Sequence, residues 1–377
     1  MMLICHLTSA HPRYDIRIFY KQCRSLAREG YDVTLVVADG DRDETRDGIR
    51  ILEAERSSGG RLSRILRATR TVGRAGVKTG ATVFHLHDPE LMPIGLKLKR
   101  KGFTVIFDAH EDLPRQILSK PYLHPFLRTV IASVMARYER YVCRKFDGVV
   151  AATPFIRDKF LKINPNTVDV NNYPKLDELS LPSGSPPSPR KKQVCYVGGI
   201  TEIRGIKDLV TAMEHLNSGA RLAIGGCFSD AKFRNRVTAI PGWNRVDDLG
   251  WLDRGAVRNL LHSSVAGVVT FRPVPNHIDA QPNKMFEYMS AGIPVIASHF
   301  PLWREIVEGN ECGICVDPQN PREIAAAIDY LVSHPDEAQR MGANGRRAVE
   351  ERYNWNVEEK KLLALYRELT ADKGTIS

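Results

Sequence analysis

Short apolar segments of strand type alternate with amphipathic segments of helical period along the whole chain. Residues 2–7 and 32–38 are mostly apolar, and the apolar positions of residues 16–28 between them recur every three or four residues. Gly30 follows that helical segment, at a point where glycine commonly ends a helix. This alternation predicts βα units that build a parallel sheet. Further strands are expected in this half of the chain at residues 82–87, 103–108, 148–152 and 168–171.

The alternation is interrupted at residues 181–189, because the sequence LPSGSPPSP cannot continue a helix or a central strand. It restarts beyond this segment and includes an amphipathic helix over residues 206–216. We therefore expect an α/β protein with two Rossmann-like, doubly wound domains, residues 1–175 and 193–352, joined by a linker over residues 176–192. Such sheets bind ligands at the carboxyl ends of their strands, so the function is expected in a cleft between two facing domains. The strands expected in the second domain are residues 193–197, 221–224, 245–249, 266–270 and 294–297.

Length and composition exclude several classes of protein. A chain of 377 residues, 43% hydrophobic and 26% charged, can bury two packed cores, which excludes disordered and collagen-like chains. Its longest apolar runs, such as residues 265–271, are far shorter than the roughly 18 residues that a membrane helix needs. The first residues lack the basic, apolar and small-residue order of a signal peptide, so we expect a cytoplasmic protein.

Two local motifs do not indicate the chemistry that they first suggest. The seven cysteines are scattered, and the single CxxC of Cys312 and Cys315 has neither a second pair nor a redox βαβ context, which favours a buried structural pair. The glycine pairs at residues 198–199 and 225–226 follow expected strands but lack the GxGxxG spacing of a dinucleotide-binding turn. An oxidoreductase is therefore disfavoured.

The positive charge is confined to the first half of the chain. Residues 1–175 carry 30 Lys and Arg against 19 Asp and Glu, a formal charge of +11, whereas residues 176–377 carry −1. This asymmetry indicates that the first half meets an anionic partner, which could be a nucleic acid, a phospholipid surface or a phosphorylated substrate.

The most informative segment is QPNKMFEYMSAGIPVIAS, residues 281–298. Asn283 is expected to begin a short helix, which the Ala-Gly pair ends before a buried strand. The N–H groups at the start of such a helix can bind a diphosphate, and Lys284 adds a full positive charge there. The carboxylate of Glu287, one turn further, suits the two hydroxyl donors of a ribose, and Asp279 stands eight positions earlier. A capped surface helix with ordinary charges is the alternative.

These residues resemble the retaining glycosyltransferases of family 4, which have the GT-B fold. The resemblance rests on the spacing of Asp279 and Glu287 and on the Ala-Gly-x-Pro-Val-Ile-Ala segment that follows, and it extends over nearly the whole chain. Residues 196–205 resemble the family's first strand and phosphate loop, and residues 250–252 resemble the segment against which the nucleotide base rests. Residues 353–377 resemble its closing helix, which crosses back to the first domain. Residues 83–88 and 105–111 resemble the strand ends that bring histidines to the cleft.

The resemblance implies transfer of a sugar from a nucleotide-diphosphate donor with retention. No cofactor is expected, and no metal is required if two cations face the phosphates. Where the family carries its usual phosphate-binding arginine this chain has Gly199, which leaves Arg204 and Lys284 as the cations for the diphosphate. Asp41 and Asp43 form a DxD, which holds a metal in some sugar transferases, but here stands in a charged run typical of a solvated loop. The implied catalytic residues are His110, Asp279, Lys284 and Arg204. The implied donor-binding residues are Gly198, Gly199, Arg204, Leu252, Asn283, Lys284, Met285 and Glu287.

Departures from the family pattern set the remaining expectations. Asp279 is shorter than the usual Glu and lacks its Gly-Phe-Gly neighbours, which affects the expected sugar contacts. His110 alone would more often cap a turn beside Glu111, but the resemblance places it at the site. The usual Gly-Gly turn near the N-terminus is replaced by RYDIR, whose side chains suggest ion pairing with an acceptor. The implied acceptor-binding residues are Arg13, Asp15, Arg17, His87 and Asp88.

Two basic segments bear on the acceptor. An amphipathic row of arginines runs from Arg61 to Arg74, and a second basic segment over residues 128–145 follows an aromatic stretch. Both fit either an anionic membrane surface or a solvated helix face, and the membrane interpretation gains weight if the acceptor is a polyprenyl-diphosphate-linked glycan. Nucleic acid is disfavoured because the chain has no basic and aromatic stacking platform. The resemblance therefore favours an enzyme of bacterial surface-polysaccharide, O-antigen or cell-envelope synthesis, cytoplasmic or peripheral on the inner face of the plasma membrane. A UDP-sugar 2-epimerase and a non-catalytic membrane-surface or polyanion-binding protein remain alternatives.

Overall fold

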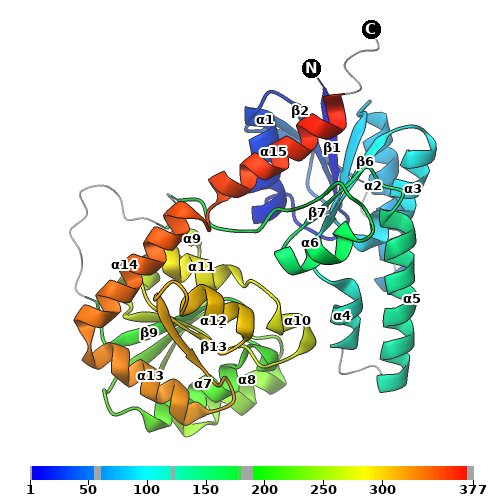
Figure 1. Ribbon diagram of the computed structural model, residues 1–377. Helices are drawn as coiled ribbons and strands as arrows, with labels where there is room; N and C mark the ends of the chain where they lie inside the picture. The colour runs from blue at the N-terminus through cyan, green and yellow to red at the C-terminus, as the bar shows by residue number, and fades with distance from the viewer. Residues whose placement is uncertain (1, 55–60, 120–123, 177, 180–189, 372–377) are drawn as a thin grey trace. The chain divides into compact units, whose positions relative to one another are not determined.

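The computed structural model describes residues 2–54, 61–119, 124–176, 178–179 and 190–371, of which residues 61–67 are described by their backbone alone. The chain divides into two compact units (Figure 1). Unit 1 comprises Met1–Asn172 and Trp355–Ser377, and unit 2 comprises Tyr173–Asn354. The expected linker segment 181–189 lies outside the described residues. In the part of the chain that is described, no helix is both long and apolar enough to span a membrane.

Unit 1 is built on an eight-stranded sheet with the order β3-β4-β2-β1-β5-β6-β7-β8. Neighbouring strands are parallel except β3 and β4, which are antiparallel. The direction of the strand order changes between β1 and β5, the two central strands. The strands are β1 (Leu3–Leu7), β2 (Asp32–Val37), β3 (Glu44–Arg46), β4 (Ile49–Glu53), β5 (Val83–Leu86), β6 (Thr104–Ala109), β7 (Gly148–Ala151) and β8 (Thr167–Asp169).

Helices cover both faces of this sheet because side chains alternate between the faces along each strand. One apolar cluster joins Leu7 and Phe84 to helices α2, α3 and α5, and the other joins Ile4 and Val83 to η1 and α15. The helix η1 is a π-helix, a form that is often found at functional sites. The helices of unit 1 are η1 (Ile16–Cys23), α1 (Arg24–Arg28), α2 (Arg61–Lys78), η2 (Pro89–Leu91), α3 (Met92–Arg100), α4 (Leu113–Leu118), α5 (Pro125–Cys143), α6 (Pro154–Leu161) and α15 (Trp355–Ala371).

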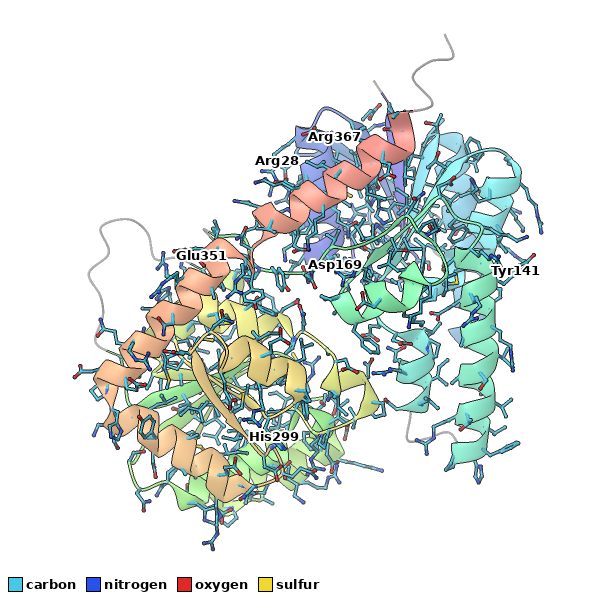
Figure 2. All side chains as sticks on the ribbon, in the orientation of Figure 1. Arg28, Tyr141, Asp169, His299, Glu351 and Arg367 are labelled. Carbon is cyan, nitrogen blue, oxygen red and sulfur yellow. The ribbon has the colours of Figure 1, made fainter. Side chains whose placement is uncertain are left out.

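The last helix, α15, packs on unit 1 beside α1 (Figure 1). Its first residue, Trp355, is buried and donates its indole N–H to the hydroxyl of Ser25 at 3.0 Å. Two exposed ion pairs add to this contact, one between Arg28 and Glu359 and one between Arg367 and Glu29, the residue that follows α1. The two arginines are labelled in Figure 2. Surface ion pairs contribute little, so we attribute the docking of α15 mainly to its buried apolar face.

Unit 2 contains a six-stranded parallel sheet with the order β11-β10-β9-β12-β13-β14. Its strand order reverses between β9 and β12. The strands are β9 (Gln193–Val197), β10 (Arg221–Gly225), β11 (Val246–Gly250), β12 (Ala266–Val269), β13 (Val295–Ser298) and β14 (Gly313–Val316). The helices are η3 (Glu202–Arg204), α7 (Ile206–Ala212), η4 (Met213–His215), α8 (Ala231–Thr238), η5 (Pro241–Arg245), α9 (Arg254–Ser263), α10 (Pro275–Ile278), α11 (Asn283–Ser290), α12 (Pro301–Val307), α13 (Pro321–Ser333) and α14 (Pro335–Glu351).

The expected fold class of two doubly wound α/β domains is confirmed, but three strands escaped the sequence pattern. The hairpin of β3 and β4 follows the charged run of Asp41 and Asp43, where a loop alone was expected. Asp41 itself is exposed, at 77% of its side chain. The third strand, β14, begins directly after Cys312, which is fully buried, and contains Cys315, which is half-buried.

Candidate functional site

In unit 2, four of the predicted residues meet at the switch point between β9 and β12, where open α/β sheets bind their ligands. Gly198 and Gly199 follow β9, Arg204 ends η3, and Lys284 lies in the first turn of α11. A Cβ atom on Gly198 would lie 2.9 Å from Nζ of Lys284, and one on Gly199 would lie 2.9 Å from a terminal nitrogen of Arg204. The two glycines therefore make room for two converging cations.

The side chain of Lys284 is buried beside two aromatic rings. Its side chain donates to the hydroxyl of Tyr196 at 3.0 Å, and its Nζ lies 4.1 Å from the centre of the Tyr196 ring and 5.0 Å from that of Phe271. The residue is only 7% exposed. Burial, followed by the charge of Arg204, holds the pKa of Lys284 well below its ordinary value.

Neither cation has an anionic partner within the described part of the chain. Arg204 donates to the Gly199 carbonyl at 3.3 Å, and Lys284 donates to a neutral hydroxyl. The hydroxyl groups of Thr201 and Thr270, on the loop after β9 and at the end of β12, are also buried without a hydrogen-bond partner. Buried charges are ordinarily paired, so this arrangement is suited to an incoming anion.

Glu287 lies one turn along α11 from Lys284 and belongs to a carboxylate–arginine–carboxylate row. Arg254 of α9 donates to Oε1 of Glu287 at 2.8 Å and to Glu178 at 2.7 Å. The Glu287 side chain keeps 16% exposure. A carboxylate fixed in this way can accept hydrogen bonds from a pair of vicinal hydroxyl groups.

The remaining predicted donor residues have different surroundings. Asp279 follows α10 and is half-buried, and Asn283 is exposed at the start of α11. Leu252 is half-buried against the core of unit 2. The side chain of Met285 is fully buried in that core, and its backbone N–H donates to the Pro282 carbonyl at 3.0 Å.

A hollow of about 410 Å³ lies beside this site, between the loops after β10 and β11. Gly226 and Cys227 line one side, and Gly250 and Trp251 line the other. A Cβ atom on Gly226 would stand 1.9 Å from the Gly198 carbonyl oxygen, so the hollow adjoins the loop after β9. Trp251 is 75% exposed, which leaves a flat aromatic surface open to a ligand.

In unit 1, five polar side chains lie on one face at the corresponding switch point between β1 and β5. His6 of β1 is the register partner of His85 in β5, and His87 follows two positions later. Asp108 is the last residue but one of the neighbouring strand β6, and His110 follows that strand. All of them except His110 are at most 1% exposed.

A hydrogen bond and two close contacts with Asp108 link these side chains into one network. Nδ1 of His6 lies 2.8 Å from Nε2 of His87, whose Nδ1 lies 3.2 Å from Oδ2 of Asp108. Nε2 of His110 lies 3.1 Å from the same oxygen. Burial lowers the pKa of His87 to about 3 and holds the pKa values of His6 and His85 well below the ordinary range.

The structure corrects the acceptor role predicted for the two arginines near the N-terminus. Arg13 is 6% exposed and pairs with Asp39 at 2.8 Å and with Glu44 at 2.6 Å. Arg17 is 5% exposed and pairs with Asp108 at 2.7 Å. Their charges are thus neutralised inside unit 1, by carboxylates that lie well beyond the RYDIR segment in the sequence.

The other predicted acceptor residues also have internal partners. Asp15 caps η1 by accepting from the N–H groups of residues 17 and 18. Asp88 is 2% exposed and accepts from the Ser9 backbone N–H at 2.6 Å, which fixes the loop after β1. With His87 buried as well, His110 and His11 are the imidazoles of this network that reach the surface, at 20% and 32% exposure.

Two groups of this network could hold a metal ion, judged by the spacing of their ligand atoms. One is His6, His85 and His87, and the other is His87, Asp108 and His110.

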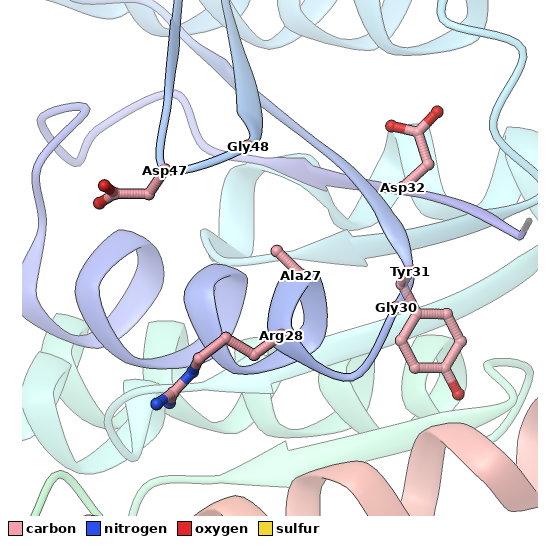
Figure 3. A pocket seen from close by; sticks show the side chains of 7 residues that line it. All are labelled: Ala27, Arg28, Gly30, Tyr31, Asp32, Asp47 and Gly48. Carbon is pink, nitrogen blue, oxygen red and sulfur yellow. The ribbon is translucent and has the colours of Figure 1, made fainter.

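Unit 1 also has a hollow of about 290 Å³, away from this network. It lies between the turn before β2 and the turn of the β3–β4 hairpin (Figure 3). It adjoins the amino end of β2, so it does not belong to the switch point.

Comparisons with known proteins agree with this geometry. Residues 17–171 match the family described as "Glycosyl transferase 4-like domain", and residues 181–348 match "Glycosyl transferases group 1". The chain is a GT-B glycosyltransferase of the family 4 type. A Methanocaldococcus jannaschii protein described as "Uncharacterized glycosyltransferase MJ1607" is 25% identical over 302 residues, which cover 76% of this chain and 75% of that protein.

Solved structures of other GT-B glycosyltransferases share the fold. Sucrose-phosphate synthase of Thermosynechococcus elongatus superposes with a TM-score of 0.79 at 19% identity, over 99% of this chain and all of that one (100%). HepE of Anabaena, crystallised with UDP and glucose, superposes with a TM-score of 0.75 at 14% identity, over 98% of this chain and 100% of that one.

Several residues of the two sites were missed by the sequence argument. Tyr196 and Arg254 give no signal because they touch Lys284 and Glu287 only through the tertiary fold. His6 and His85 did carry a signal, since each alternates with apolar neighbours and so points to the same sheet face as His87.

Proposed function

We propose that this glycosyltransferase moves a sugar from a nucleotide-diphosphate donor to a saccharide acceptor with retention of configuration and without a metal ion. The observation that carries the proposal is the pair of cations Arg204 and Lys284, which converge on a glycine loop and have no described anionic partner. Two positive charges can replace a divalent metal in stabilising a diphosphate leaving group.

The reaction needs electrostatic stabilisation more than covalent chemistry. As the bond from the sugar to the diphosphate breaks, negative charge develops on the leaving group and positive charge on the sugar ring. Arg204, Lys284 and the free N–H groups that begin α11 stabilise the leaving group. We assign Glu287 to the ribose hydroxyls, and Asp279 and His110 to the hydroxyls of the transferred sugar.

The unit 2 site offers a place for each part of a nucleoside diphosphate. The diphosphate is assigned to the cation pair, the ribose to Glu287, and the base to the hollow of about 410 Å³ beside Trp251. Because HepE was crystallised with UDP, a uridine nucleotide is the first candidate, and GDP is the second.

We propose that the acceptor is a glycan linked to polyprenyl diphosphate, met at the inner face of the plasma membrane during synthesis of a bacterial surface polysaccharide. The exposed start of α5 supports this proposal: Phe126, Leu127 and Val134 are exposed by 70%, 50% and 55%. Arginines at positions 137, 140 and 144 are exposed further along the same segment. Apolar and basic side chains together suit an anionic lipid surface.

Thermal unfolding with UDP, GDP and ADP, followed by turnover of the corresponding sugar nucleotides, tests the proposed function. A nucleotide that binds the folded state alone raises Tm by mass action. We expect one diphosphate to raise Tm without added metal, and its sugar nucleotide to be consumed when saccharide acceptor is present. Conversion of the donor without acceptor would indicate an epimerase, and lipid binding without nucleotide binding would indicate a non-catalytic protein.

A further inference from the structure

The buried polar layer of unit 1, made of His6, His85, His87 and Asp108, costs free energy of folding. His6, His85 and Asp108 are each fully buried, between the sheet and the helices η1 and α15. Polar groups in such a layer destabilise the fold unless all of them are hydrogen-bonded. Their place at the switch point, under His110, suggests that the layer serves the site above it.

We propose that this layer positions His110, with Asp108 bound to Nε2–H of His110 so that Nδ1 is left as the hydrogen-bond acceptor for a substrate hydroxyl group. His6, His87 and Asp108 are then positioning residues, and of these four residues only His110 touches the ligand. The inference rests on the proposed function only for the identity of that ligand as a sugar.

The argument starts from Asp108, because its carboxylate can only accept hydrogen bonds. Arg17 donates to both of its oxygens, at 3.0 and 2.7 Å, and Gln22 donates to Oδ2 at 2.7 Å. Burial acts to raise the pKa of Asp108, but Arg17 and His110 hold it well below the ordinary range. The nitrogens of the two histidines that face Oδ2 must therefore carry hydrogen.

This requirement fixes the tautomer of each histidine in turn. His87 has hydrogen on Nδ1, so its Nε2 is bare and accepts from Nδ1–H of His6 at 2.8 Å. The bare Nε2 of His6 faces the hydroxyl of Tyr366 on α15 at 3.4 Å, and that oxygen accepts from Nδ1–H of His85 at 2.8 Å. The chain ends at Nε2 of His85, which is buried without a partner.

His110 takes the opposite tautomer from the three buried histidines. Its Nε2 lies 3.1 Å from Oδ2 of Asp108, and in this tautomer the contact of 3.4 Å between its Nε2 and Nδ1 of His87 joins two donors that share one acceptor. The ring of His11, held by Asp15 and Asp88, lies 4.9 Å away and supports the outer side of His110. Nδ1 of His110 is then the acceptor that this network presents to a ligand.

A metal ion is the competing explanation, bound either by His6, His85 and His87 or by His87, Asp108 and His110. The ring geometry opposes the first group, and the elemental analysis below tests both. The rings of His85 and His87 are stacked at 4.7 Å with 23° between their planes, and those of His6 and His87 at 5.1 Å with 16°. Stacked rings direct their nitrogens along parallel planes, whereas three ligands of one ion must converge on it. The hydrogen bond of 2.8 Å between His6 and His87 uses the two nitrogens directly.

Nitrogen NMR of the full-length protein labelled at histidine tests the tautomers without reference to activity. Each signal is assigned from a single His→Gln variant. We expect His110 to be protonated on Nε2, and His6, His85 and His87 on Nδ1, at pH 7.5. An Nδ1-protonated His110, or one zinc ion per chain by elemental analysis, overturns the inference and leaves the proposed function standing.

Kinetics of two His110 variants test the role of the bare nitrogen. The amide oxygen of His110→Asn can accept a hydrogen bond near the position of Nδ1, whereas His110→Ala has no acceptor. We expect kcat to fall by roughly 100-fold in the alanine variant and to recover at least tenfold in the asparagine variant. Equal loss in both variants contradicts the acceptor role.

His87→Phe tests the positioning role, because it keeps a ring but removes both hydrogen bonds. We expect kcat to fall by roughly tenfold while KM for the sugar nucleotide stays unchanged, with His215→Phe, at an exposed position in unit 2, as the control. A change in Tm alone, with kcat retained, indicates a purely structural layer and overturns the inference. Absence of turnover in the wild type, with nucleotide binding also absent, instead refutes the proposed function.

Discussion

The ammonium group of Lys284 lies 3.0 Å from the hydroxyl oxygen of Tyr196 and 4.1 Å from the centre of that ring. The aromatic face and the hydroxyl stabilise the cation, but they do not neutralise it. With Arg204 beside the same glycine loop, two charges are held close together at a cost to the stability of the unliganded protein. An anionic ligand removes that cost.

Replacing Lys284 by Met should therefore separate activity from stability. We expect turnover to fall by roughly 100-fold or more, the effect of losing one preorganised charge, while Tm is kept or rises. Lys207→Met, at an exposed position on α7 close to Arg204 in sequence, is the control and should change neither quantity. Unchanged turnover in both Lys284→Met and Arg204→Met would remove the basis for the diphosphate site.

Cys227 offers a chemical probe of the hollow beside the cation pair. It is exposed and lines that hollow, whereas Cys5, Cys23, Cys143, Cys195 and Cys312 are buried and Cys315 is half-buried. We expect a small alkylating reagent to modify Cys227 first, and a saturating nucleotide to slow that reaction roughly tenfold or more by excluding the reagent. Mass spectrometry of digests measures the rate, and Cys315 is the internal reference. Equal labelling with and without nucleotide would place the base elsewhere.

Arg254 should influence nucleotide binding only through Glu287. Its removal by Arg254→Met frees the Glu287 carboxylate, so we expect KM for the sugar nucleotide to rise roughly tenfold, or about 1.4 kcal/mol. In a Glu287→Gln background the same change should have little further effect, because the two residues act as one unit. Arg221→Met, which breaks the exposed pair of Arg221 with Asp247, is the matched control. Fully additive effects of the two substitutions would contradict this positioning role.

The fold could be predicted because it depends on local patterns. Strand β9 begins and ends where the apolar pattern does, and β1, β2 and β7 differ from it by one residue. The β3–β4 hairpin was missed because Glu44–Arg46 is polar and half-exposed, so its pairing with β4 leaves no hydrophobic period. Strand β14 was missed because Gly313–Val316 is short and only its ends are buried.

In the candidate sites, local sequence patterns could place some residues, whereas contacts with distant parts of the chain could not be predicted. Lys284 and Glu287 could be placed on one short helix because local helix and strand signals mark its start and its end. Arg13 and Arg17 were assigned to a ligand because a sequence does not show that Asp39 and Asp108, far along the chain, neutralise them. The part played by Tyr366 could not be predicted at all, since it reaches His85 from a helix 281 positions away.

The buried histidines should make the protein less stable in mild acid. His6, His85 and His87 are neutral when folded, and burial lowers the pKa of His87 to about 3, whereas an unfolded histidine titrates near 6.5. Below about pH 6.5 the unfolded chain binds more protons, so each histidine lowers the free energy of unfolding by about 1.4 kcal/mol per pH unit.

Urea unfolding between pH 7.5 and 5 measures this dependence. His85→Phe should reduce the slope by about one histidine's share, because it removes one titrating group and keeps the ring volume. His11 opposes the trend, since the Asp15 hydrogen bond raises its pKa, and His11→Gln should therefore steepen the slope. Stability that does not change with pH over this range would show that the buried histidines are charged in the folded protein.

The start of α5 is the best place to test membrane association, because its apolar side chains are exposed among the described residues of unit 1. Changing Phe126, Val130 and Val134 together to Ser should weaken binding to vesicles that contain phosphatidylglycerol, since these side chains are exposed by 70%, 43% and 55%. Neutralising the arginine row from Arg61 to Arg74, whose first three side chains lie outside the described ones, should act in the same direction through lost attraction to anionic lipid. Nucleotide affinity should stay unchanged in both variants, because the cation pair belongs to unit 2.

Tyr330→Ser, at an exposed position of unit 2, is the control for the loss of an exposed apolar side chain. Vesicle binding that survives both sets of changes would assign these residues to ordinary solvated helix faces and leave the charge of the first half without a lipid role.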